Sequence, residues 1–110
     1  MSIFQHLQRA IEAKDADLWC EVYHDDFQFI RHQSGTAMNK EQIRTMLHQM
    51  LNSDAVVQTE HRCLYENDDV LIEHSFMTFP DNSKEAVLVV HTLLDGKIIR
   101  TETGATPIVT

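Results

Sequence analysis

The sequence predicts an α+β fold in which a cone-shaped, curved antiparallel sheet wraps around three N-terminal helices. Three observations predict it. Apolar residues at helical spacing dominate the first half, strand-like runs separated by polar breaks fill residues 56–103, and 110 residues are enough for a single core. Helices in one block and strands in another are typical of this class. We therefore expect one domain over residues 1–110.

The first two helices are marked by polar residues that can cap them. Ser2 is a good N-cap and forms a capping box with Gln5, so a helix is expected from residue 3. Asp15 can cap a second, short helix, which the acidic pair Asp25-Asp26 is expected to end. Alternation then predicts a strand over residues 27–32, followed by a turn at residues 33–36.

The clearest helix follows Asn39, which can form a second capping box with Gln42. Apolar residues then recur at positions i, i+3, i+4, i+7 and i+8 up to Leu51, which makes a full core-facing stripe. Four strands are expected next, at about 56–66, 69–79, 84–94 and 97–103. The tail from Gly104 onward is expected either to fray or to extend an edge strand.

The three breaks between these strands predict a register. Asn67-Asp68 and Asp95-Gly96 suit two-residue turns, and residues 80–83 suit a four-residue loop. The turns then align three rows of side chains across the sheet, and all three rows share one face because faces alternate every second residue. The rows are His61, His74, Val89 and Glu102; Cys63, Ile72, His91 and Arg100; and Tyr65, Val70, Leu93 and Ile98.

That face mixes apolar walls with a few ionisable groups, which is typical of a small-molecule pocket. A histidine there can act as a general base near neutral pH. The candidate catalytic residues are His74, Glu102 and His61. The candidate ligand-binding residues are His91, Arg100, Arg31, Cys63, Tyr65, Phe76, Phe29 and Trp19. A polar cavity lining without catalysis, and a structural Arg100–Glu102 ion pair, are the alternative readings of the same residues.

Charge and composition narrow the class of partner. The formal net charge is -8, which argues against nucleic acid and anionic membranes, since both need a basic surface. No stretch has the length and apolar character of a membrane span, and no secretory signal is visible, so a cytoplasmic protein is expected. Its two cysteines, Cys20 and Cys63, are then expected to be reduced thiols.

Short phrases in the chain give a family resemblance. Residues 13–18 lead to Tyr23-His24-Asp25-Asp26-Phe27, Gly35-Thr36-Ala37 precedes the third helix, and Asp95-Gly96-Lys97-Ile98 makes the last hairpin. With the order of elements, these phrases resemble the nuclear-transport-factor-2-like superfamily, in particular its SnoaL-like and ketosteroid-isomerase-like members. The resemblance implies a cone-shaped fold with a cavity at its open end, lined at positions matching His74, His91, Leu93 and Glu102.

Two departures from the resemblance bear on activity. The ketosteroid isomerases place a tyrosine at about Leu7 and a general-base aspartate at about Arg31. Leucine donates no hydrogen bond, and a permanent cation accepts no proton, so this chemistry is not expected. Three functions remain open: binding of a small apolar or weakly acidic molecule, a cofactor-free acid/base enzyme, and a dimerisation module whose cavity is filled by its own side chains.

The sequence also gives expectations for metals, cofactors and a second copy of the chain. The histidines show no HxH or HExxH spacing, so we expect no metal, and none of the three functions requires a cofactor. The opposite face of the sheet is expected to carry Leu64, Leu88 and Val90, which is too apolar for a surface in water. We therefore expect a homodimer through that outer face.

Overall fold

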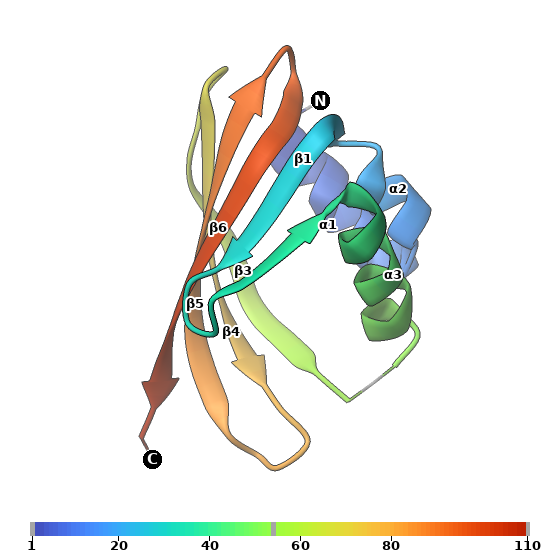
Figure 1. Cartoon of the computed structure of the whole chain (residues 1–110). Coiled ribbons are helices and arrows are strands. Elements are labelled where there is room, and N and C mark those ends of the chain that lie inside the picture. Colours follow the sequence, from blue (N-terminus) through green and yellow to red (C-terminus); the bar gives the residue numbers. More distant parts are fainter. Residues whose placement is uncertain (1, 54, 110) are drawn as a thin grey trace.

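The computed structural model describes residues 2–53 and 55–109, and they form three helices and six strands. The helices are α1 (Ile3–Ala13), α2 (Ala16–Cys20) and α3 (Lys40–Leu51). The strands are β1 (Tyr23–Arg31), β2 (Thr36–Asn39), β3 (Val57–Glu66), β4 (Val70–Thr78), β5 (Lys84–Leu94) and β6 (Lys97–Ile108). The expected α+β class is confirmed, and the helices lie together on one side of a curved sheet (Figure 1).

The strands form one sheet in the order β2-β1-β6-β5-β4-β3. All neighbours are antiparallel except β1 and β6, which run parallel. The tail does not fray: residues 104–108 continue β6 past the end of β1 and pair with β5 alone, which is the edge extension that was one of the two expected outcomes. Pairing with β5 satisfies the backbone groups on that side of the tail.

Both capping boxes are present as expected. Ser2 and Asn39 each accept a hydrogen bond from a backbone N–H three residues on, and the glutamine at that position bonds back. The prediction for β1 was wrong at its start: the strand begins at Tyr23 and contains the acidic pair that was expected to end α2. Strand β2 was also missed, because four residues after a turn carry little periodic signal.

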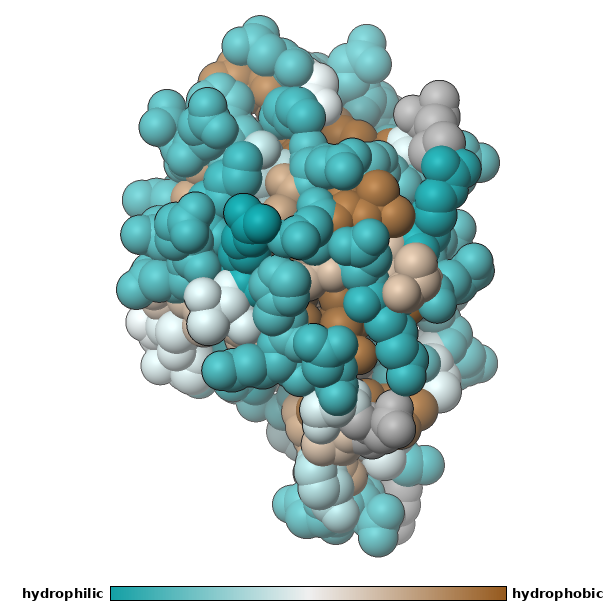
Figure 2. Space-filling view, turned by 90° about the vertical axis from the view of Figure 1, so that its right-hand side faces the viewer, coloured by the Kyte–Doolittle hydropathy of each residue, from teal (hydrophilic) through white to brown (hydrophobic). Residues whose placement is uncertain are grey.

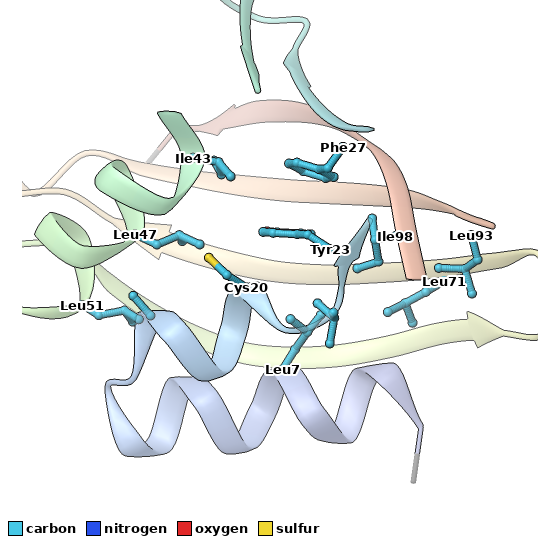
Figure 3. Close-up of a cluster of buried hydrophobic side chains, with 12 residues drawn as sticks. Leu7, Cys20, Tyr23, Phe27, Ile43, Leu47, Leu51, Leu71, Leu93 and Ile98 are labelled. Carbon is cyan, nitrogen blue, oxygen red and sulfur yellow. The ribbon is translucent and has the colours of Figure 1, made fainter. Parts of the chain in front are cut away.

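The core lies between the helices and the face of the sheet turned toward them, called the inner face below. Leucine and isoleucine side chains from α1 and α3 point toward aromatic and aliphatic side chains of the strands (Figure 3). Phe27, Leu7 and Ile98 are no more than 2% exposed.

The outer side of the helix layer is mainly hydrophilic, with hydrophobic side chains visible only in gaps (Figure 2). None of the helices in the described residues has the length and apolar character needed to cross a bilayer.

The predicted register holds at one turn and slips at the other two. Asp95 and Gly96 both have positive φ, as a two-residue hairpin turn requires, and Leu93 pairs with Ile98 as expected. The loop between β4 and β5 has five residues, because Thr78 pairs with Lys84. Bulges interrupt β3 against β4, and β5 against β6.

Each slip of one residue turns a side chain to the other face. Strand β4 therefore presents Leu71, Glu73 and Ser75 to the helices, and these three are buried. The neighbours Ile72, His74 and Phe76 point outward. The face predicted for His74 was wrong for this reason.

Candidate functional site

Four side chains from four neighbouring strands make a hydrogen-bonded chain on the inner face. Glu73 of β4 accepts hydrogen bonds from Nε2 of His61 on β3 and from Nε2 of His91 on β5. His91 Nδ1 lies 2.7 Å from the hydroxyl of Thr101 on β6. An ionised carboxylate only accepts, so both Nε2 atoms carry hydrogen, and in a neutral His91 the Nδ1 atom accepts from Thr101.

This network is nearly closed to water. The side chains of Glu73 and His91 are 7% and 5% exposed, and that of His61 is 16% exposed. Burial opposes ionisation of Glu73, but the hydrogen bonds and charges of His61 and His91 outweigh it and lower the pKa of Glu73 to about 2. Glu73 is therefore a buried carboxylate that stays ionised at neutral pH.

A bulge in β3 explains how His61 reaches Glu73. Gln58 also faces inward and donates a hydrogen bond to Ser75, yet residues 58 and 61 would lie on opposite faces of a regular strand. The register shifts between Thr59 and Arg62, and Glu60 has a φ of 53°, in the left-handed region. The extra residue therefore turns both Gln58 and His61 to the same face.

A pocket of about 160 Å³ lies between the helices and the start of β3. Its walls are Ile11, Lys14, Trp19, Met50, Leu51, Ser53, Val56, Gln58 and Met77. Most of these side chains are apolar, and Gln58 donates a hydrogen bond to the inward-facing Ser75. A hollow of about 210 Å³ on the other side of Lys14 and Leu51 is more polar, and we expect water to fill it.

The indole of Trp19 connects this pocket to the core. Its Nε1–H donates to the hydroxyl of Tyr23 at 2.8 Å, and Tyr23 stacks on Phe27 with ring centroids 3.9 Å apart. Burial raises the pKa of Tyr23 above its usual range; the Trp19 hydrogen bond lowers that pKa only in part, and the nearby Glu73 charge raises it. Tyr23 is therefore a neutral phenol at any ordinary pH.

The structure divides the predicted site residues between the two faces of the sheet. His61 and His91 lie on the inner face and share Glu73. Phe29 packs against the core, and Trp19 lines the pocket. Arg31 is farther along β1, where it forms an ion pair of 3.9 Å with Glu85.

The remaining predicted residues lie on the outer face or at an edge. His74, Phe76, Arg100, Glu102 and Tyr65 were expected inside, and the bulges and the longer loop turn them outward. The expected row of His61, His74 and Glu102 does not form, so these three cannot act on one bound molecule.

Most of these outward-facing side chains have partners on the outer face. Arg100 and Glu102 form an ion pair, which was the alternative reading of these residues, with Nε 3.3 Å from the carboxylate; His32 also bonds Glu102 at 3.0 Å. The ring of His74 meets that of Phe76 edge-on. Its Nδ1 atom is buried and has no hydrogen-bond partner among the described residues.

Cys63 is exposed on the edge strand β3, although its backbone pairs with Glu73. Desolvation and the charges of Glu66 and Glu73 raise the pKa of its thiol, which makes it a poor nucleophile. In the described part of the chain, no group of three or more histidine, cysteine or acidic side chains is arranged to hold a metal ion.

Glu73 is the residue of the inner-face network that sequence reasoning missed. The turn-based register assigned Glu73 to the outer face beside Arg62. The available signal was a glutamate next to His74 and Ser75 in a strand whose other residues are mostly apolar. A buried charge needs partners, and two histidines on the flanking strands can provide them.

Comparison with known proteins agrees with this architecture. Residues 4–101 match the family model described as a SnoaL-like domain. No curated protein matches the chain significantly. Among solved structures, an NTF-2 like protein of unknown function from Burkholderia xenovorans is 14% identical, with a TM-score of 0.77 over 98% of this chain and 83% of that chain.

Two further structures extend this likeness. A putative ketosteroid isomerase from Kribbella flavida is 10% identical, with a TM-score of 0.78 over 98% of this chain and 78% of that one. An NTF2-like protein from Mesorhizobium loti is 8% identical, with a TM-score of 0.81 over 94% of this chain and 88% of that one. Identities this low show a shared fold and leave the activity to be argued from the site.

Proposed function

Because the chain belongs to the SnoaL-like domain family, we propose that it binds a small, mostly apolar molecule in the pocket beside Trp19. The single observation that carries this proposal is the make-up of the pocket: apolar side chains from α1, α3 and β4 around a few polar groups. Such a mixture gives affinity through the apolar walls and orientation through the polar atoms.

The volume of the pocket limits the size of the ligand. About 160 Å³ is close to a cavity that holds one benzene ring, and well below the roughly 300–1,000 Å³ of pockets for drug-sized ligands. A ligand of about one six-membered ring fits, and a steroid does not. This size limit adds to the reasons, at Leu7 and Arg31, for not expecting ketosteroid isomerase chemistry.

The other two functions have less support from the site. An acid/base enzyme built on His74, Glu102 and His61 would need residues that lie on opposite faces of the sheet. His61 and His91 do not line the pocket, and both ring nitrogens of His91 are already hydrogen-bonded. A module filled by its own side chains would leave no pocket of this size.

The single tryptophan provides a direct test, because the protein has only one indole N–H signal in a ¹⁵N–¹H spectrum. We expect cyclohexanone, or a comparable one-ring compound, to shift this signal in a saturable way. Met77→Phe should abolish the shift by filling the pocket. Met38→Phe, the same change at a half-buried methionine away from the pocket, should leave it intact. A one-ring panel without any saturable shift would contradict the proposal.

The outer face of the sheet carries a second part of the proposal, that two copies of the chain associate there. Leu88 is 43% exposed and Tyr65 is 55% exposed, and they lie beside the half-buried Ile72 and Val90. Arg62 and Arg100 share this face with Glu102, so a two-fold arrangement can pair opposite charges. The buried Nδ1 of His74 would then find a partner in the second copy.

A further inference from the structure

Three polar side chains line the pocket beside Trp19, and they differ in how far they are open to water. Lys14 and Ser53 are exposed, whereas Gln58 is half-buried. A polar group that is partly closed to water costs more to leave without a hydrogen bond than one at the surface. Gln58 is therefore the polar lining residue whose hydrogen bonds matter most to a ligand inside the pocket.

The contacts of Gln58 fix the direction of its amide group. Gln58 lies opposite Met77 in the pairing of β3 with β4, and Met77 also lines the pocket. The amide nitrogen of Gln58 donates a hydrogen bond of 3.1 Å to the hydroxyl oxygen of Ser75, which lies two residues from Met77 on β4. Ser75 is only 2% exposed, so the nitrogen of the amide is turned toward a buried group.

The amide oxygen of Gln58 is left as a hydrogen-bond acceptor. A carboxamide carries its acceptor oxygen and its donor nitrogen on the same carbon atom. Because the nitrogen is turned to Ser75, the oxygen is directed away from Ser75, and it has no hydrogen-bond partner among the described residues. Gln58 itself lines the pocket, so a ligand in the pocket contacts this side chain directly.

We propose that Gln58 selects one-ring ligands that carry a hydroxyl group, whose hydrogen is donated to the amide oxygen. This inference rests on the proposed function and names the chemical class of its ligand. The ring would contact Trp19, Met50 and Met77 while the hydroxyl group meets Gln58. An amide does not titrate, so the acceptor is present across the neutral pH range.

Phenol and toluene separate this role from general packing, because they have nearly the same shape and differ by a hydroxyl against a methyl group. Each is titrated while the Trp19 indole signal is followed. We expect Gln58→Met, which keeps the length of the side chain, to weaken phenol binding by about fivefold and toluene binding by less than about twofold, because only phenol loses a hydrogen bond. Gln28→Met, the same change at an exposed glutamine on β1, should alter neither affinity.

The other outcomes overturn the proposal in ways that can be told apart. Equal weakening of both ligands by Gln58→Met, or no weakening of either, would mean that Gln58 makes no hydrogen bond to the hydroxyl group, and the binding function would stand. No binding of any one-ring compound to the wild type would remove the proposed function and this inference together.

A second measurement on the wild type covers a Gln58→Met variant that does not fold. The ¹³C signal of the Gln58 side-chain carbonyl should move downfield when phenol binds, as an amide carbonyl does when its oxygen accepts a hydrogen bond. Toluene, which has no hydrogen to donate, should leave this signal near its place in the free protein. A carbonyl signal that responds alike to both bound ligands would contradict the proposal.

Discussion

Strand β4 carries a glutamate on its inner side and a histidine on its outer side, and their surroundings differ. Glu73 is bonded by two imidazoles and is almost fully buried, whereas His74, the next residue, has a buried nitrogen without a partner among the described residues. A polar group inside a finished core has its partners within the chain. A polar group left unpaired on a half-buried face indicates that the face is covered by something else, which supports the proposed dimer.

The largest effect is expected from breaking the inner network. Glu73→Ala would leave the Nε2 hydrogens of His61 and His91 without an acceptor, and we expect it to lower the free energy of unfolding by about 3 kcal/mol. Urea denaturation measures this loss. Glu102→Ala, the same change on the outer face, removes contacts that are open to water and should cost less. Equal losses for the two variants would contradict the contrast between the faces.

Acid pH tests the same contrast without removing a side chain. The pKa of Glu73 is about 2 in the folded protein, below its ordinary value of 4.5. Its contribution to stability is therefore complete above about pH 4.5 and is lost as the pH falls toward 2, by up to about 3 kcal/mol. Urea midpoints between pH 6 and 2 should fall more steeply in the wild type than in Glu73→Gln. Parallel slopes would mean that Glu73 is not held ionised.

The smallest of the three effects concerns the outer face. Leu88→Lys places a charge in the middle of the proposed dimer surface and removes an apolar contact, so we expect the free energy of dimerisation to weaken by roughly 2 kcal/mol for the two copies together. Sedimentation equilibrium measures the dissociation constant. Val109→Lys, at an exposed position near the end of the chain, serves as the control. A wild type that remains monomeric at high concentration would remove the dimer from the proposal.

Much of the fold could be predicted from local signals. The capping boxes at Ser2 and Asn39 marked helices correctly, because a cap depends only on residues three positions apart. The Asp95-Gly96 turn was also correct, since its two positive φ angles favour these residue types. Strand β2 and the path of the tail depend on distant partners, and the local pattern did not contain them.

The candidate site was predicted only in part. His61, His91, Trp19 and Phe29 lie on the inner side as expected, while His74, Arg100 and Glu102 lie on the other side. The difference comes from the extra residue in the loop between β4 and β5 and from the bulge between β5 and β6, which the local sequence does not reveal. The segment around Tyr23 was assigned to a helix, whereas it begins β1.

The amino-acid sequence by itself determined the α+β class, the long helices with their caps, the last hairpin and the acidic surface, because each follows from neighbouring residues or from composition. Only the tertiary structure decided which side of the sheet each ionisable residue faces. A strand alternates sides at every residue, so one bulge or one extra loop residue exchanges inside for outside, and the packing of the whole sheet selects between them.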